Sequence, residues 1–176
     1  MGAAGVVDQL KECVRDIPDF PVKGIIFKDI TPLLRRPDAL KLACDALSEP
    51  FKDRGVTAVC GMEARGFIFG SVIAYRLGVG FVPLRKPGKL PYDTRTISYQ
   101  LEYGTATLEV HKDAVGPKDR VLMVDDVLAT GGTMAASCRL VESLGAEIVA
   151  CAFVIELGFL KGREKLNHDL HALIRY

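Results

Sequence analysis

Four stretches of the chain are continuously apolar, and this feature limits the fold more than any other. They are "VTAVCG" (56–61), "VGFVPL" (79–84), "RVLMV" (120–124) and "EIVACAFVIEL" (147–157). Continuous rather than alternating apolar runs indicate strands that are covered on both faces, as in a parallel sheet. The stretches "GFIFGSVIAYRLG" and "GTMAASCRLVESLG" lie between them and are predicted to be helices. The fold class is therefore α/β, with a mainly parallel, helix-flanked sheet.

The chain is predicted to be one domain, residues 1–176, because its length and its 49% of hydrophobic residues suffice for one sizeable core. The N-terminal part, about 1–35, falls outside the strand–helix alternation. We expect an amphipathic helix over 6–17 that Pro18 ends, and then a short extended piece at 25–27 whose backbone groups need partners.

An insertion at about 86–110 also interrupts the alternation. Apolar and polar residues alternate from Ile97 to Tyr103, and Gly104 follows near the expected reversal of the chain. This period of two predicts a half-exposed antiparallel hairpin that projects from the sheet.

The balance of charge excludes several classes of partner. The 23 basic and 22 acidic residues give a net charge of +1, which favours neither nucleic acid nor an anionic membrane. The five cysteines are never spaced C-x-x-C, which argues against a zinc site or a disulfide framework and favours a reduced, cytoplasmic compartment. We see no leader segment and no apolar run of the roughly 18 residues that a membrane helix needs.

The stretch "VLMVDDVLATGGTM" (121–134) carries the strongest functional signal. Asp125 and Asp126 stand where the buried strand is expected to end, which is where open parallel sheets bind ligands. If the backbone turns there, both carboxylates can reach one pocket and accept hydrogen bonds from a vicinal diol. The double glycine then opens a helix, whose first amides and dipole favour a phosphate. The loop residues expected at that phosphate are Thr130, Gly131, Gly132 and Thr133.

Each half of this stretch also has an ordinary structural interpretation, as solvated acids and as a helix-start turn. Their combination is more specific and indicates a ribose 5-phosphate. No G-x-x-x-x-G-K-[ST] or G-x-G-x-x-G motif occurs, which disfavours nucleotide hydrolysis and dinucleotide binding.

The order of four apolar residues, two acids and T-G-G-T resembles the phosphoribosyl-pyrophosphate signature of the type I phosphoribosyltransferases. The resemblance implies that family's fold over residues 20–165, with a small N-terminal hood over about 1–35. It also implies that Asp125 and Asp126 hold the ribose hydroxyls, and that the loop from Ala129 to Thr133 holds the 5-phosphate.

A pyrophosphate leaving group requires positive groups near it. Lys86 and Lys89 follow another predicted strand and could simply be solvated, but "RKPGKLP" and the turn at Glu63 resemble pyrophosphate-contacting segments of the members that use adenine. The residues implied to contact pyrophosphate are Glu63, Ala64, Arg65, Arg85, Lys86 and Lys89. Arg65 is also expected to be catalytic, and we hypothesise that the Glu63–Ala64 peptide bond is cis, as in related enzymes.

The stretch "FPVKGIIFKDIT" resembles the adenine-reading hood of the same members. The resemblance implies that the Ile26 carbonyl accepts from the exocyclic amino group of adenine and that the Lys28 amide donates to the ring. It implies that Phe27 stacks on one face of the base, although a phenylalanine is otherwise more often a core residue. Leu128 would cover the other face.

The insertion at 86–110 is the natural lid, because an oxocarbenium-like ribose must be protected from water. Glu102, in the "LEYG" motif of relatives, is the candidate general acid or base, although it could also be an exposed hairpin glutamate. Mg²⁺ is the expected cofactor, bound mainly through substrate and water, and no protein metal cage is predicted.

The expected reaction joins adenine and phosphoribosyl pyrophosphate to give AMP and pyrophosphate, in a homodimer as the resemblance implies. Two alternatives remain open. One is a hypoxanthine- or xanthine-type transferase on the same scaffold. The other is a non-catalytic purine regulator that binds phosphoribosyl pyrophosphate, although such regulators carry an added DNA-binding domain and this chain has no basic stripe.

Overall fold

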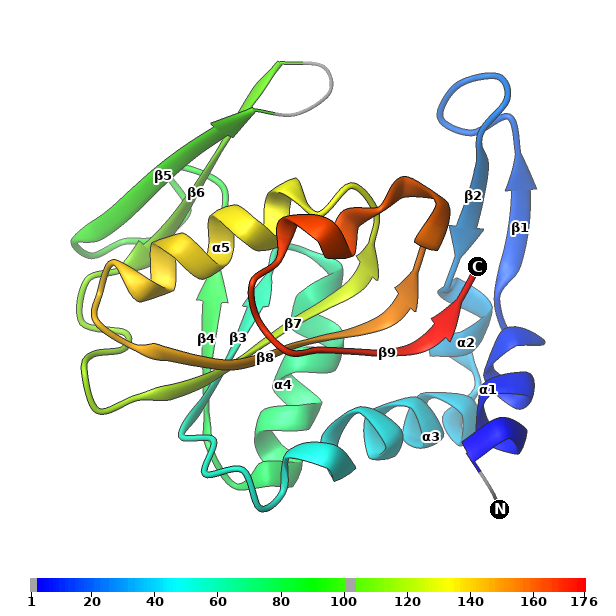
Figure 1. The fold of residues 1–176 in the computed structure, drawn as a ribbon, viewed down its shortest axis with the longest axis horizontal. Coiled ribbons are helices and arrows are strands. Elements are labelled where there is room, and N and C mark those ends of the chain that lie inside the picture. The colour runs from blue at the N-terminus through cyan, green and yellow to red at the C-terminus, as the bar shows by residue number, and fades with distance from the viewer. Residues whose placement is uncertain (1–2, 101–103) are drawn as a thin grey trace. The chain divides into compact units, whose positions relative to one another are not determined.

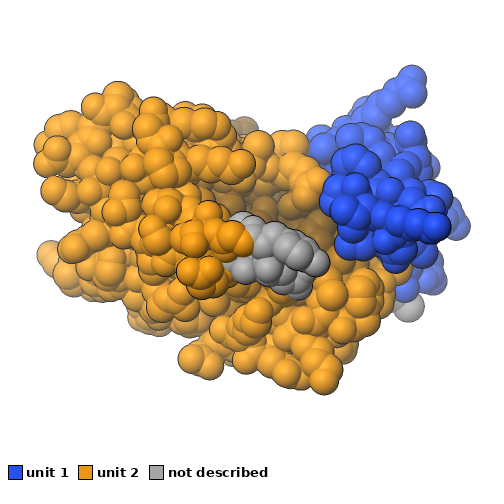
Figure 2. All heavy atoms as spheres, turned by 90° about the horizontal axis from the view of Figure 1, so that it is seen from above, with its two compact units in different colours: residues 1–46 blue, residues 47–176 orange. Residues whose placement is uncertain are grey.

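The structure is a computed structural model, and it describes residues 3–100 and 104–176. The chain forms two compact units, residues 1–46 and residues 47–176, which Figure 2 colours separately. The first unit extends beyond the hood expected at about 1–35, because it includes most of the helix that starts at Pro37. A single domain over 1–176 stays a prediction.

The first unit pairs two short strands. Its elements are α1 (Ala3–Lys11), β1 (Arg15–Pro18), β2 (Ile26–Asp29), α2 (Thr31–Arg35) and most of α3 (Pro37–Ser48). β1 and β2 pair antiparallel, with Ile17 opposite Phe27. The predicted helix over 6–17 is therefore wrong beyond Lys11, because the extended segment after Ile25 needs a partner for its backbone groups and residues 15–18 provide it.

The second unit contains the predicted parallel sheet, which is confirmed. Its strands lie in the order β4-β3-β7-β8-β9, and every neighbouring pair is parallel (Figure 1). The strands are β3 (Ala58–Met62), β4 (Gly80–Leu84), β7 (Arg120–Leu128), β8 (Glu147–Glu156) and β9 (Leu170–Arg175). All five residues of β3 are buried, and so are nine of the ten in β8, as expected for strands that are covered on both faces.

Two long helices cover this sheet. α4 (Arg65–Leu77) connects β3 to β4, and α5 (Gly132–Glu142) connects β7 to β8. The two crossovers run in opposite directions along the sheet, and such crossovers are right-handed, so the helices lie on opposite faces. Short 3-10 turns complete the unit at η1 (Glu49–Phe51), η2 (Gly158–Leu160) and η3 (Gly162–Lys165).

The predicted hairpin is confirmed as a separate antiparallel pair, β5 (Thr94–Gln100) and β6 (Thr105–His111). Its apolar face is not free, because Leu108 and Val110 are buried in the main core. The opposite face, with Ser98, is exposed. The hairpin is thus anchored on one side and open to solvent on the other. No helix in the described part of the chain is long and apolar enough to cross a membrane.

Candidate active site

The candidate site lies where the direction of the strand order reverses. β3 and β7 are adjacent and parallel, with Gly61 opposite Val124, and their crossover helices leave in opposite directions. Open α/β sheets bind ligands outside the carboxyl ends of strands at such a point. The segments that follow Met62 and Leu128 therefore leave the same end of the sheet, and together with the last residues of β7 they hold many of the residues that the motifs indicated.

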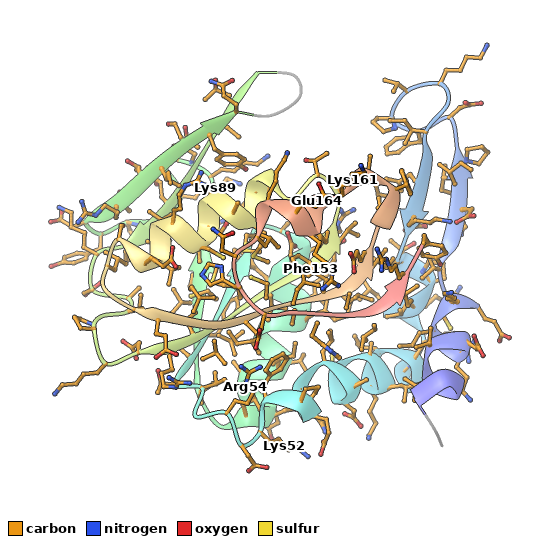
Figure 3. The ribbon with its side chains drawn as sticks, viewed as in Figure 1. Lys52, Arg54, Lys89, Phe153, Lys161 and Glu164 are labelled. Carbon is orange, nitrogen blue, oxygen red and sulfur yellow. The ribbon has the colours of Figure 1, made fainter. Side chains whose placement is uncertain are left out.

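The predicted phosphate loop has the geometry of an anion cradle. Gly131 has a φ of 78°, a left-handed conformation that favours glycine, and it precedes the first residue of α5. Among the described residues, no side chain caps this helix start, so its first amides remain available to an anion. A pocket of about 90 Å³ lies here. It is lined by Asp125, Val127, Leu128, Ala129, Thr130, Gly131, Gly132, Thr133, Met134 and Phe153, the last labelled in Figure 3.

The backbone of Gly162, a residue that the motifs did not place at the site, packs against this loop. A Cβ atom at 162 would collide with the carbonyl oxygen of Ala129, and a Cβ at 131 would collide with the carbonyl of Gly162. The two glycines thus allow the start of η3 to pack directly on the loop backbone. The second glycine of "LGFLKGREK" was the only available signal, and it does not name its partner.

An ion pair fixes the turn that carries Gly162. Arg163 donates to both carboxylate oxygens of Glu156, with Nε 3.0 Å from Oε1 and Nη2 2.6 Å from Oε2. This hydrogen bonding lowers the pKa of Glu156, which is only 3% exposed at the end of β8. A bidentate pair of this kind holds the guanidinium in one geometry beside the end of β8.

The two acids do not stand at the end of a strand, which corrects the sequence expectation. β7 continues through them to Leu128, because it keeps pairing with β8 as far as Glu156. Asp125 lines the pocket, and its Oδ1 accepts from the Asp126 amide at 2.9 Å. Asp126 forms an ion pair with Arg65 at the start of α4, with 2.6 Å between Oδ2 and Nε.

Burial dominates the electrostatics of the acid pair. It raises the pKa of Asp125 well above its ordinary value of 3.8, and the neighbouring charge of Asp126 adds to the effect. Burial also raises the pKa of Asp126, while the guanidinium of Arg65 opposes this shift. A cation or a pair of hydroxyl donors near these acids would favour their charged forms.

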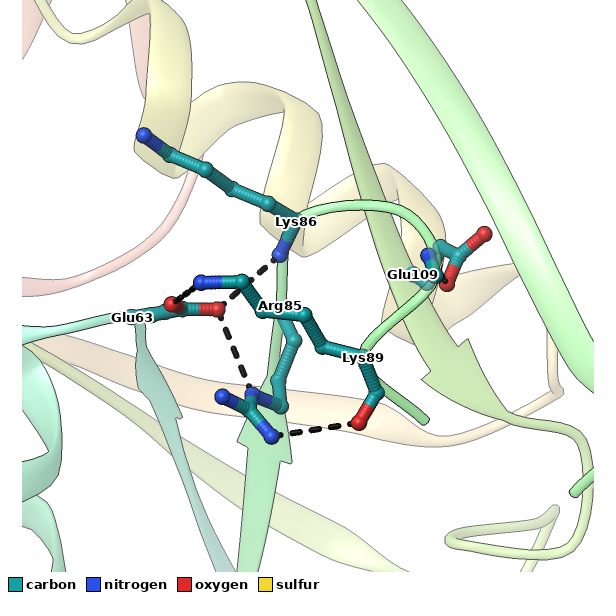
Figure 4. A network of polar contacts seen from close by, with 6 residues as sticks. Glu63, Arg85, Lys86, Lys89 and Glu109 are labelled. Atoms are coloured by element: carbon teal, nitrogen blue, oxygen red, sulfur yellow. Dashed lines mark hydrogen bonds and ion pairs between the residues drawn. The ribbon is translucent and has the colours of Figure 1, made fainter. Parts of the chain in front are cut away.

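Three of the expected pyrophosphate residues, Arg85, Lys86 and Lys89, contact the carboxylate of a fourth, Glu63, as Figure 4 shows, whereas Arg65 pairs with Asp126. Glu63 accepts from Arg85 Nε and from the Lys86 amide, each at 3.2 Å, and it forms an ion pair with Lys89. The hydrogen bond from Lys89 is the largest of the effects that lower the pKa of Glu63. The side chain of Lys86 points away from this network. The Glu63–Ala64 peptide bond is cis, so that hypothesis is confirmed.

The hairpin contacts the phosphate loop directly, through a residue that sequence reasoning did not single out for the site. The Tyr99 hydroxyl lies 3.2 Å from Thr133 Oγ1 and donates to it. Tyr99 was visible only as part of the apolar face of the hairpin. Glu102 lies outside the described residues, so its expected role stays a prediction.

The residues expected to read a base lie in the first unit. Ile26, Phe27 and Lys28 are consecutive in β2, and the ring of Phe27 packs edge-on against Phe20 with 5.2 Å between centroids. Pro18 is opposite Ile26 in the strand pair and has no N–H, so it cannot donate to the Ile26 carbonyl. Leu128 belongs to the second unit, where it lines the pocket but is only 1% exposed.

A glycine-rich helix start and a buried acid at the switch point of a parallel sheet define a domain of the phosphoribosyltransferase class. The model of the phosphoribosyl transferase domain matches residues 30–173. An adenine phosphoribosyltransferase from Methylococcus capsulatus is 64% identical over 171 residues, which cover 97% of this chain and all of that protein.

Solved structures of adenine phosphoribosyltransferases are also similar to this chain. An adenine phosphoribosyltransferase from Rhodothermus marinus has a TM-score of 0.93 and 54% identity, covering 98% of this chain and 99% of that one. The enzyme from Saccharomyces cerevisiae, complexed with D-2,5-dideoxy-2,5-imino-altritol 1,6-bisphosphate and adenine, has a TM-score of 0.92 and 42% identity, covering 97% and 99%. The chain belongs to the adenine phosphoribosyltransferase family.

Proposed function

We propose that this chain transfers the 5-phosphoribosyl group from phosphoribosyl pyrophosphate to adenine, giving AMP and pyrophosphate. A ring nitrogen of adenine forms a bond to the anomeric carbon, the bond from that carbon to pyrophosphate breaks, and the ring loses a proton. The observation that carries the proposal is the pocket at the switch point, where Asp125 and residues 129–133 line one cavity. Membership of the family supports it.

In this proposal, one set of residues holds the 5-phosphate of phosphoribosyl pyrophosphate and another holds its ribose hydroxyls. The loop from Ala129 to Thr133 holds the 5-phosphate through the first amides of α5 and the hydroxyls of its threonines. Asp125 and Asp126 accept from the ribose hydroxyls. The raised pKa of both acids favours this role, because hydroxyl donors stabilise the charged carboxylates that burial disfavours.

The pyrophosphate end meets cations that two carboxylates, Glu63 and Asp126, hold in place. Arg65 pairs with Asp126, while Arg85 and Lys89 pair with Glu63. We propose that pyrophosphate competes with Glu63 for Lys89, whose side chain is 44% exposed and can turn toward the ligand. The Lys86 ammonium, which lies outside the network, and the backbone at Glu63–Ala64 complete this subsite.

Mg²⁺ fits the residues at the donor site. The carboxylate of Asp125 is a hard oxygen ligand on the pocket lining, and a bound cation would oppose the burial that raises its pKa. When bound, Mg²⁺ would neutralise charge on the leaving pyrophosphate. We expect most of its other ligands to be substrate oxygens and water.

The acceptor is read by backbone groups of β2. The Ile26 carbonyl accepts from the adenine amino group, and Pro18 opposite it supplies no competing donor. The Lys28 amide donates to the ring and Phe27 stacks on one face of it, while the role expected for Leu128 on the other face stays a prediction. Hypoxanthine and guanine present the reverse order of donor and acceptor, which would leave buried polar groups unpaired. The relative from Saccharomyces cerevisiae, complexed with adenine, supports this choice.

We also propose a cytoplasmic homodimer. All five cysteines lie in the described part of the chain and are free thiols, which suits a reducing compartment. The dimer is supported by an apolar stripe on α4, where Ile68, Val72 and Tyr75 are exposed at helical spacing. Replacing Tyr75 with arginine should shift the sedimentation of the protein toward the monomer.

The proposed activity is tested with a magnesium-dependent assay of pyrophosphate release across adenine, hypoxanthine, guanine and xanthine. We expect AMP formation with adenine, at least about a hundredfold faster than any other product, since a mismatched donor pattern costs several kcal/mol. Preference for hypoxanthine or xanthine would instead indicate the other transferase. Donor binding without any product would indicate a regulator.

A further inference from the structure

Two cysteines and a histidine that are distant in the sequence come together in the second unit, away from the donor pocket. Cys138 lies on α5, Cys151 on β8, and His168 on the segment before β9. Both cysteines are buried, and their sulfur atoms are 3.6 Å apart. An imidazole nitrogen of His168 lies within 4.8 Å of both sulfurs. None of the three residues has a role in the proposed reaction.

The two nitrogens of His168 have different surroundings. Nε2 lies 2.9 Å from Oε1 of Glu142, one helical turn after Cys138 on α5. Nδ1 is buried and has no hydrogen-bond partner within the part of the chain that the structure describes. A carboxylate that holds one nitrogen, with the other left unpaired, is the arrangement that orients histidine ligands in metal sites.

We propose that Cys138, Cys151 and His168 bind one Zn²⁺ through two thiolates and Nδ1, with Glu142 orienting the imidazole. Zn–S bonds of about 2.3 Å at a tetrahedral angle place two sulfurs about 3.7 Å apart, close to the separation observed here. The imidazole needs to approach by at most about 1.2 Å to complete the set. Binding releases the two thiol protons, and thiolates with imidazole favour Zn²⁺ over the Mg²⁺ of the reaction.

A second cavity gives the ion an entry path. It has a volume of about 180 Å³ and is lined by Ala135, Cys138, Arg139, Glu142, Lys165, Leu166, Asn167 and His168. Water from this cavity can supply a fourth ligand. The ion would join α5, whose start forms the phosphate loop, to β8 and to the segment that follows η3. We therefore assign it a structural role that holds these elements together.

The full-length, untagged protein should bind one equivalent of Zn²⁺ after dialysis, as measured by elemental mass spectrometry. Co²⁺ should replace it and give a thiolate-to-metal charge-transfer band with tetrahedral d–d absorption. Because both cysteines are buried and replacing them leaves a cavity in the core, the decisive variants are at partly exposed positions. Glu142→Gln should weaken Zn²⁺ affinity about 10- to 100-fold, His168→Asn should abolish the Co²⁺ charge-transfer band, and both should retain transferase activity without added zinc.

Cys44→Ala is the matched control, because it removes a buried thiol of the first unit and should leave metal binding unchanged. Three results would each overturn the proposal. They are a wild-type protein that gives no charge-transfer band with Co²⁺, a band that persists in folded His168→Asn, and loss of two free thiols to a disulfide in place of metal uptake.

Discussion

The charge that Asp125 needs for its proposed function is disfavoured by its position in the fold. Burial and the neighbouring Asp126 raise its pKa, so its ionised form costs stability at neutral pH. An amide of the same shape avoids this cost and can still accept from the Asp126 amide. Activity and stability are therefore opposed at this residue, as is common in active sites.

We predict that Asp125→Asn raises the free energy of unfolding by roughly 0.5–2 kcal/mol at pH 7 and weakens phosphoribosyl pyrophosphate binding by about tenfold or more. The folded-state pKa is raised, so wild type loses stability as pH rises from 3.8 toward that value. The stability difference should thus be small in acid and grow toward neutral pH. Urea unfolding at several pH values and donor titration measure both effects; an equally large gain in acid would contradict the electrostatic cause.

Glu102 is predicted to exchange a proton with the adenine ring. Glu102→Leu should lower kcat about 10²- to 10⁴-fold, the usual contribution of a general acid or base, with little change in the KM for phosphoribosyl pyrophosphate. Steady-state kinetics with both substrates varied provide the measurement. Replacement of the exposed Gln100 by leucine on the same hairpin is the control, and near-normal turnover of Glu102→Leu would remove the residue from the mechanism.

For single residues, the short motifs predicted which residues line the site better than they predicted which residues contact each other. The loop from Ala129 to Thr133 and Asp125 line one pocket, as "DDVLATGGT" indicated. The pair between Arg65 and Asp126 could not be predicted, because it joins residues whose proximity depends on how α4 starts beside β7. The proposed zinc ligands could not be predicted either. Cys151 follows Cys138 by 13 residues and His168 follows Cys151 by 17, so no short spacing links them.

Among the elements, the start of η3 constrains the shape of the phosphate loop at 129–133, which is distant in sequence. Gly162→Ala introduces a methyl group against the Ala129 carbonyl, and backbone on both sides leaves little room for adjustment. We predict that the KM for phosphoribosyl pyrophosphate rises at least about tenfold, equivalent to about 1.4 kcal/mol. Gly116→Ala, which meets nothing within 4 Å, should leave KM unchanged. Equal KM values for the two variants would refute the coupling.

Helices and strands were predicted correctly where the hydrophobic pattern fitted one kind of element. The prediction was wrong where pairing with another strand decided the structure. The largely buried strands β3, β7 and β8 followed from continuous apolar runs. The segment 15–18 has helical spacing but forms β1, because pairing with β2 satisfies more backbone groups than a longer α1 would. Similarly, the acids did not end β7, since β8 continues beside it and the ladder extends to Leu128.

For the whole molecule, two groups of carboxylates predict an unusual dependence of stability on pH. Protonation of Asp125 and Asp126, whose pKa values are raised, stabilises the folded state as pH falls from neutral toward 3.8. Glu63 and Glu156 have lowered pKa values, because Lys89 and Arg163 respectively bind them. Their contribution is full above 4.5 and is lost as pH falls further through their folded-state values.

We therefore expect the free energy of unfolding to rise slightly below neutral pH, reach a maximum, and fall steeply in acid. Urea titrations between about pH 3 and about pH 8 measure this profile. Glu156→Gln should flatten the acid limb, and Asp125→Asn should remove part of the rise. A stability that declines steadily from pH 7 would contradict the assignment of the raised pKa values.

The division of the chain into two compact units assigns donor and base to different stretches of sequence. The residues proposed for the sugar donor all lie within 47–176, whereas the backbone proposed to read adenine lies within 1–46. Base preference can then change by recombination or mutation of a short N-terminal stretch while the donor machinery is inherited intact. We expect a chimaera with the first unit of a relative of different base preference to shift toward that preference, with Leu128 and Glu102 still supplied by the second unit, and to keep its own affinity for the sugar.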